Sequence, residues 1–254
     1  MLSRKTKFTA LAIATAISVM AGGAFPNAQH LRVQVGNFGE GFIVALGGKL
    51  YDNLWLIVDA EPPAQRHPSF PKDVDLPAPE TWRCVSCHGW DYRGAKGERA
   101  KLGGQAAFHS LQHLTGADPA VIIRKIRSSP HNYPDAALPD FALEIMALFI
   151  SRGQYDRDAL LDKSGRATGD LKRGRNIFEG ACMNCHQPDG RADLIGEKGD
   201  RSSLGWVARN RPEQALHKIR NGVPGADMLA VGFLEQDQIR DLFTYLQSLD
   251  PNQN

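Results

Sequence analysis

Cysteine is scarce in this sequence, and neither sign of charge dominates it. Only 4 of the 254 residues are cysteine, which is too few for a disulfide scaffold of this length. The 30 Lys and Arg residues nearly balance the 28 Asp and Glu residues, with no long run of either sign, so nothing indicates a nucleic-acid partner. The 42% hydrophobic residues, 25 Gly and 15 Pro are typical of a globular protein and exclude collagen-like, disordered and coiled-coil chains.

The amino-terminal segment has the pattern of a secretory signal peptide over residues 1–24. Basic residues lie close to the amino terminus, an apolar stretch follows over residues 8–20, and small residues occupy 21–24. We expect cleavage after Ala24, with Ala28 as the second choice. An uncleaved membrane anchor is the alternative, although the apolar stretch is short for a span of about 20 residues.

No later segment is a good candidate for a transmembrane helix. The most apolar one, residues 38–58, contains Glu40, Lys49 and Asp52, and charges at the centre of a bilayer are costly. We therefore expect an exported, periplasmic protein with no membrane span after signal cleavage, and a membrane-anchored one if the signal peptide is retained.

All four cysteines lie in two copies of one motif, C-x-x-C-H. Two thiols three residues apart on a helical turn can each add to a vinyl group of haem, and the adjacent His can present an imidazole nitrogen to the iron. The motif therefore predicts two covalently bound haem c groups. The predicted attachment cysteines and iron-binding histidines are Cys84, Cys87 and His88 in the first copy, and Cys182, Cys185 and His186 in the second.

Two other interpretations of the motif stay open. A single zinc ion could be held by both cysteine pairs, or disulfides could form in the oxidising compartment that the signal peptide implies. A zinc site does not need a His directly after each pair, and its pairs usually lie much closer than the 98 residues between Cys84 and Cys182. Export also matches a cofactor that is attached outside the cytoplasm, so haem attachment is the preferred interpretation.

The sequence resembles the class I c-type cytochromes, here in a tandem di-haem arrangement. Residues 174–178 (GRNIF) precede Cys182 as the amino-terminal helix does in that family, and residues 241–246 (DLFTYL) are similar to its carboxy-terminal helix. The resemblance covers residues 171–250 well and residues 45–152 more loosely. It implies an all-α fold with two cytochrome c-like helical domains in tandem.

A short internal repeat supports two domains independently of that resemblance. The tripeptide Lys-Ile-Arg occurs at residues 125–127 and again at 218–220. Each copy lies six residues after a proline, Pro119 or Pro212, that could open a helix at its first position. The chain is therefore interpreted as a duplicated unit.

The repeat and the motifs divide the chain into segments. We expect a first cytochrome c domain over residues 25–152, a polar linker over 153–170 and a second cytochrome c domain over 171–254. Residues 47–59 place their apolar side chains on one helical face and are predicted to form the first domain's amino-terminal helix. Prolines concentrated over residues 60–82 predict an extended insertion that wraps this domain.

Met228 is the candidate sixth ligand of the second haem. It lies 42 residues after His186, in a loop that resembles the family's methionine loop, although Leu229 stands where the family often has proline. The only other methionine in this half, Met183, lies inside the attachment motif. A thioether sulfur at this position would complete the coordination of the second iron.

His131 is the candidate sixth ligand of the first haem, because the matching loop contains no methionine. It lies 43 residues after His88, almost the spacing found in the second half. Counting from the repeated tripeptide instead places Asp135 opposite Met228, which leaves the two alignments four residues apart. Ligation by His131 would give bis-histidine coordination.

Other side chains could occupy that position, or it could be vacant. Met146 lies in an apolar helix pattern and is most simply a core residue, whereas His67 lies in the insertion and could reach back over the haem. His109 and His113 are four residues apart and would share a helix face, which could be a metal pair but is more typical of a solvated or haem-edge surface. Two further histidines are interpreted as surface residues, His30 and His217.

An exported di-haem electron carrier is the leading interpretation of these features. Two saturated irons would leave no place for a substrate, so the haems would pass single electrons between a donor and an acceptor redox protein. Methionine raises the haem potential and a second imidazole leaves it lower, so we expect the first haem to have the lower potential. The sequence names neither partner, and it leaves the oligomeric state open.

Two alternative functions follow if the first iron has an open position. The protein could be a haem enzyme, or an enzyme's haem subunit, that acts on peroxide or a sulfur oxyanion in a pocket built by residues 60–82. It could also be a binding module whose open ferrous haem senses a gas.

Overall fold

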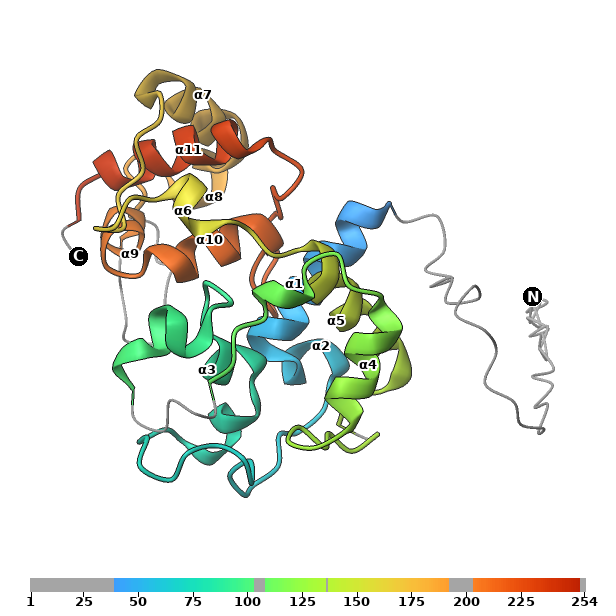
Figure 1. Ribbon diagram of the computed structural model, residues 1–254. Coiled ribbons are helices and arrows are strands. Elements are labelled where there is room, and N and C mark those ends of the chain that lie inside the picture. The colour runs from blue at the N-terminus through green and yellow to red at the C-terminus, as the bar shows by residue number, and fades with distance from the viewer. Residues whose placement is uncertain (1–38, 103–107, 136, 192–202, 252–254) are drawn as a thin grey trace, which may run out of the picture. The chain divides into compact units, whose positions relative to one another are not determined.

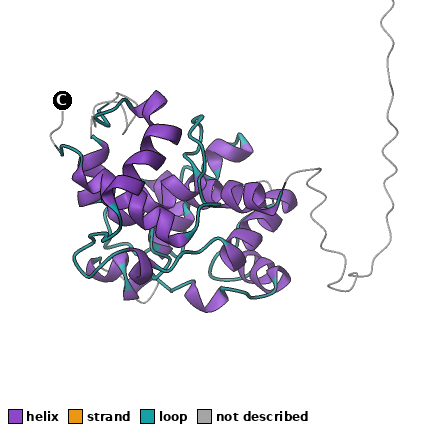
Figure 2. Ribbon diagram, turned by 90° about the horizontal axis from the view of Figure 1, so that it is seen from above, coloured by secondary structure: helices purple, strands orange, loops and turns teal. Residues whose placement is uncertain are grey.

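All regular structure in the described part of the chain is helical, as Figure 2 shows. The computed structural model describes residues 39–102, 108–135, 137–191 and 203–251. Its α-helices, labelled in Figure 1, are α1 (Glu40–Asn53), α2 (Trp55–Val58), α3 (Cys84–His88), α4 (Pro119–Arg127), α5 (Asp140–Arg152), α6 (Arg157–Leu160), α7 (Leu171–Ala181), α8 (Met183–His186), α9 (Leu204–Asn210), α10 (Pro212–Asn221) and α11 (Gln236–Ser248). Short 3-10 helices are η2 (Ala78–Trp82), η3 (Gly94–Lys96), η4 (Glu98–Lys101) and η6 (Gln112–Leu114). The predicted all-α fold class is confirmed.

The predicted signal peptide over residues 1–24 lies outside the described residues. Among the helices that the structure does describe, none has the length and apolar character needed to span a bilayer.

Helices α7 and α11 pack closely in the second half of the chain, and a glycine permits their approach (Figure 1). A Cβ atom on Gly174 of α7 would lie 2.0 Å from the backbone oxygen of Asp241 in α11. Phe178, one turn further along α7, is fully buried and contacts Tyr245 with 5.3 Å between ring centres. The segments predicted as amino- and carboxy-terminal helices of this half therefore form its central helix pair.

Helices α1 and α5 repeat this arrangement in the first half. A Cβ atom on Gly47 of α1 would lie 2.6 Å from the backbone oxygen of Ile145 and 2.4 Å from the Cβ of Phe149, both in α5. Each half thus pairs its first and last long helices through a glycine, which adds a structural repeat to the sequence repeat.

Prolines open the two helices that carry the repeated tripeptide. Pro119 begins α4, where the side chain of Asp118 accepts a hydrogen bond from the backbone N–H of Ala120, and Pro212 begins α10. Proline suits a first helical position because its missing N–H group would have no partner there. These two predicted helix starts are confirmed.

The predicted helix over residues 47–59 is shifted in the structure. Helix α1 already begins at Glu40, whose carboxylate lies in the first turn, where the helix dipole favours negative charge. It ends at Asn53, whose side chain accepts a hydrogen bond from the N–H of Trp55 and so competes with continued helix. The short helix α2 then follows.

One hydrophobic core runs through both halves of the described chain. It joins Leu50 of α1 and Phe149 of α5 to Leu216 of α10 and Phe243 of α11. The segment predicted as a polar linker, residues 153–170, also contributes buried side chains to this core, namely Tyr155, Leu160 and Leu161.

A buried histidine connects α10 to the first half, so the prediction that His217 lies at the surface is wrong. Its side chain is fully buried, and Nε2 donates a hydrogen bond to the carbonyl of Gly48 at 3.0 Å. Nδ1 therefore accepts the hydrogen bond from the Tyr92 hydroxyl at 2.8 Å. Burial lowers the pKa of His217 to about 4, so the ring is neutral at neutral pH.

A buried carboxylate forms a second connection between the halves. Asp52 of α1 pairs with Arg83 at 2.7 Å and with Lys218 of α10 at 3.0 Å, and its own side chain is 2% exposed. Two cations around one carboxylate offset the cost of burying it.

Candidate functional site

The first C-x-x-C-H motif forms α3, a single helical turn held on both sides. The hydroxyl of Ser86 donates to the carbonyl of Glu80 at 2.7 Å, which ties the turn to η2. The hydroxyl of Tyr51 donates to the carbonyl of Gly89 at 2.6 Å, which ties its end to α1. Gly89 has a φ of 74°, a left-handed value that ends the helix directly after His88.

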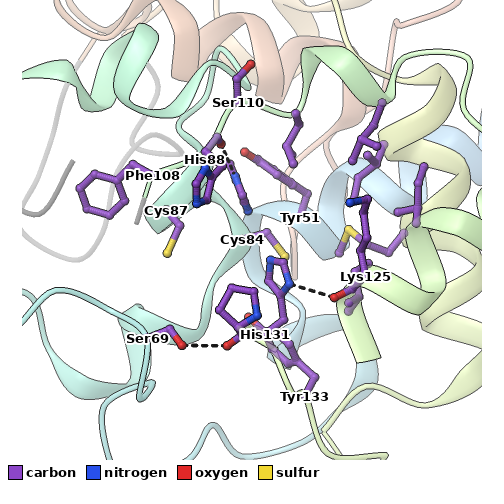
Figure 3. Close-up of a pocket in the computed structure, with 18 of the residues that line it drawn as sticks. Tyr51, Ser69, Cys84, Cys87, His88, Phe108, Ser110, Lys125, His131 and Tyr133 are labelled. Atoms are coloured by element: carbon purple, nitrogen blue, oxygen red, sulfur yellow. Dashed lines mark hydrogen bonds between the residues drawn. The ribbon is translucent and has the colours of Figure 1, made fainter. Parts of the chain in front are cut away.

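A cavity of about 970 Å³ lies beside α3, and Figure 3 shows its centre. Cys84, Cys87 and His88 form part of its wall, and His131 lies in the wall as well. The structure therefore brings the first motif and the candidate sixth ligand of that half into one pocket.

Apolar side chains supply much of the remaining wall. They come from α1, α4, α5 and neighbouring loops and include Tyr51, Leu114, Ile122, Ile126, Leu138, Met146 and Ile150. The charged side chains in the wall are all basic: Arg83, Lys96 and Lys125. A large apolar cavity with cationic groups suits haem, which has a broad apolar face and two propionate carboxylates.

Burial keeps the two thiols of the first motif protonated. It raises the pKa of Cys84 to about 12 and the pKa of Cys87 to about 11. A thioether carries no charge, and the same burial does not oppose a covalent link to haem.

All four cysteines are free thiols. Within the described ranges, no three His, Cys, Asp or Glu side chains converge in a way that would hold a metal ion.

His88 has one ring nitrogen fixed by the backbone and the other left for a ligand. Its Nδ1 donates to the carbonyl of His109 at 2.6 Å, which leaves the lone pair on Nε2. Burial lowers the pKa of His88 to about 4, so the ring is neutral at neutral pH. A neutral imidazole with an oriented Nδ1–H group is the form that binds a metal through Nε2.

His131 has the same arrangement on the other side of the pocket. Its Nδ1 donates to the carbonyl of Lys125 at 3.1 Å, and burial lowers its pKa. The ring centres of His88 and His131 lie 6.1 Å apart, with 33° between the ring planes. Figure 3 shows these two side chains close to one another, with Cys84 and Cys87 beside them.

The other candidates of the first half have different roles. Met146 is buried in α5 and lines the cavity as a core residue. His67 is buried, and its Nε2 contacts the carbonyl of His131 at 2.9 Å. His109 and His113 line the cavity but do not share a helix, because only His113 lies in η6, so that expectation is wrong.

The second C-x-x-C-H motif spans the end of α7 and α8. Cys185 is exposed, whereas Cys182 and His186 are half-buried. Burial raises the pKa of the Cys182 thiol and lowers the pKa of His186. Nδ1 of His186 is buried, and among the described residues it has no hydrogen-bond partner.

Met228 lies half-buried in the loop between α10 and α11. A glycine at the start of this loop shapes it, because Gly222 has a φ of 82° and a Cβ atom there would lie 2.7 Å from the backbone oxygen of Met228. The loop is also tied back to α10 by backbone hydrogen bonds from Val231 to Ile219 and from Gly232 to Arg220. These bonds fix the part of the loop that follows Met228.

The comparison with known families identifies the domain formed by residues 171–250. Residues 171–250 match the family model of cytochrome c. They form a cytochrome c domain. This domain contains the helix pair α7 and α11, the second C-x-x-C-H motif and Met228, and it implies covalently bound haem c and a role based on electron transfer. Within residues 171–250 the all-α fold is accordingly cytochrome c-like.

A solved structure of a thiosulfate dehydrogenase (TsdBA) from Marichromatium purpuratum is also similar to this chain. The two share 16% sequence identity with a TM-score of 0.27, and the match covers 85% of this chain and 48% of that one. The chain thus spans about half the length of that protein. A TM-score of this size does not establish a common fold, so thiosulfate chemistry stays a property of that protein.

Proposed function

We propose that this protein is an exported di-haem cytochrome c that passes single electrons between two periplasmic redox proteins. The observation that supports this most is the distance between the His88 and His131 ring centres, 6.1 Å. Two imidazoles on opposite sides of one metal, with bonds of about 2 Å and ring radii of about 1.2 Å, have ring centres about 6.4 Å apart. The spacing of the two rings would therefore allow His88 and His131 to hold one iron between them.

The hydrogen bonds of the two rings point to the same role. Both Nδ1 atoms donate to backbone carbonyls, those of His109 and Lys125, so both Nε2 lone pairs are available. Such bonds also orient a ligating ring and raise its basicity. Neither imidazole has to lose a proton before it can bind.

If His88 and His131 hold the first iron, the residues around this site have the following roles. Haem bound through Cys84 and Cys87 supplies an iron that changes between Fe(III) and Fe(II). His131 would hold the iron together with His88 and keep small molecules from it, and apolar side chains of α4 and α5 line the same pocket. Lys96 and Lys125 provide positive charge for the propionates, whereas Arg83 is already paired with Asp52.

The cytochrome c domain completes the proposal with its own pair of ligands. His186 and Met228 would hold the second iron, and the thioether would raise its potential above that of the bis-histidine site. Electrons therefore run from the first half to the second. The partners are one donor protein and one acceptor protein. We expect no nucleic-acid partner.

Carbon monoxide tests whether both irons are saturated. We expect the spectrum of the fully reduced protein at neutral pH to stay unchanged for minutes after CO is added, because both sixth positions hold strong protein ligands. The reduced spectrum is recorded before and after mixing. Rapid CO binding by half of the haem would contradict the proposal.

Catalysis at the first haem is a second candidate function, and the positive charge of the pocket favours it. No acidic side chain accompanies Lys96 and Lys125 among the described lining residues, so the cavity attracts anions such as a sulfur oxyanion. This function requires an open iron or a displaceable His131. The CO experiment therefore separates it from the carrier.

A further inference from the structure

The loop that carries His131 is held from outside by the Pro-rich insertion. The hydroxyl of Ser69 donates to the carbonyl of Pro130 at 2.8 Å. The side chain of His67 contacts the carbonyl of the next residue, His131, at 2.9 Å. Two consecutive carbonyls of the loop are thus held by residues more than 60 positions earlier in the chain.

The direction of the His67 hydrogen bond follows from its other nitrogen. The backbone N–H of Ser69 donates to Nδ1 of His67 at 3.1 Å, so Nδ1 carries the lone pair. Nε2 therefore carries the hydrogen and donates it to the carbonyl of His131. The neutral ring satisfies both of its nitrogens in this position.

Packing leaves the His67 ring little freedom to move. It lies edge-on to Trp82 with 4.4 Å between ring centres and contacts Tyr133 at 5.8 Å. Its backbone N–H donates to the hydroxyl of Thr81 at 2.9 Å, and the Thr81 side chain is itself buried in η2. The ring is a fixed point against which the loop is held.

Contacts from outside stabilise this loop, because its own backbone conformation is energetically unfavourable. Asn132, the residue after His131, has a φ of 46°, in the left-handed region that non-glycine residues seldom adopt. Within the loop, the backbone N–H groups of His131 and Asn132 share one acceptor, the carbonyl of Ser128. The Nδ1 bond of His131 to Lys125 and the bond from the Tyr133 hydroxyl to the carbonyl of Trp82 also hold the loop, and the contacts from His67 and Ser69 add a restraint on the backbone of residues 130 and 131.

We propose that His67 is a positioning residue for the first haem site. Through its bond to the carbonyl of His131 it keeps that imidazole opposite His88, and residues 60–82 act as a strap that keeps the sixth position closed. This inference rests on the proposed ligation of the first iron by His131.

Two variants of His67 separate the hydrogen bond from the packing. His67→Phe keeps an aromatic ring against Trp82 but removes the donor, whereas His67→Gln has an amide that can still donate to the carbonyl. The haem-loaded, fully reduced proteins are mixed with excess CO, and the rate at which the first haem binds it is followed. This rate reports how often His131 leaves the iron.

We expect His67→Phe to bind CO about 3 to 10 times faster than wild type, the factor that one buried hydrogen bond contributes. His67→Gln should stay close to the wild-type rate. In the oxidised form, the methionine-to-iron band of the second haem should be the same in all three proteins, which shows that the effect is local.

Several outcomes would overturn the inference. A wild-type rate for His67→Phe, in a protein whose first haem opens fully in His131→Ala, rejects the role of His67 and leaves the ligation intact. Equal acceleration by Phe and Gln rejects the hydrogen bond as the cause. An unchanged spectrum in His131→Ala rejects the ligation and the inference together.

If His67→Phe does not fold, Ser69→Ala decides. It removes the bond to Pro130 at an exposed position, and we expect CO binding about 2 to 5 times faster than wild type. A wild-type rate in that variant rejects the strap.

Discussion

Replacing His131 by Ala is expected to convert the first haem from a six-coordinate, low-spin state to a five-coordinate, high-spin state. The imidazole whose ring centre lies 6.1 Å from that of His88 is removed, and Ala offers no atom that can bind iron. In the reduced protein, CO should then bind one of the two haems within the mixing time. The second haem should be unaffected.

A neighbouring histidine provides the matched control for this variant. His113 lines the same cavity and is exposed, and it has no ring contact with His88. His113→Ala should keep a low-spin first haem that does not bind CO. If His131→Ala kept the wild-type spectrum, or if both variants opened the site equally, the proposed ligation would be wrong.

Replacing Met228 by Ala is expected to lower the potential of the second haem and to abolish its methionine-to-iron charge-transfer band in the near infrared. A thioether stabilises ferrous iron, so its loss should lower the potential by on the order of 0.1 V, within the roughly 0.8 V range that axial ligands span. A spectroelectrochemical titration measures both effects. The potential of the first haem should stay the same.

Met183→Leu is the control for this second variant. Met183 lies inside the attachment motif and packs against the hydrophobic core, so Leu preserves its volume. The band and both potentials should remain at their wild-type values. A near-infrared band that survived in Met228→Ala would reject Met228 as the ligand.

Features that depend on short sequence patterns could be predicted from the sequence. The attachment chemistry needs two thiols and a histidine within five residues, and the helix starts at Pro119 and Pro212 depend on the backbone of one residue. The spacing of 43 residues between His88 and His131 nominated a side chain that the structure places in the pocket of the first motif. The ligation itself stays a prediction.

Features that depend on packing between distant segments could not be predicted. His217 is buried because Gly48 and Tyr92, from two other parts of the chain, supply partners for both ring nitrogens. The composition of residues 60–82 excluded long helices but gave no sign that His67 holds the loop of His131, 64 residues away. Neither contact leaves a periodic pattern in the sequence.

The number of haem groups on the chain tests the central claim most directly. Intact mass spectrometry of the exported protein, produced in cells with a working cytochrome c maturation system, should show the polypeptide plus two covalently attached haems. Replacing Cys84 and Cys87 by Ser should remove one haem and leave the other. A polypeptide without haem, with one haem at residues 182–186 alone, or with a zinc ion instead would contradict the di-haem proposal.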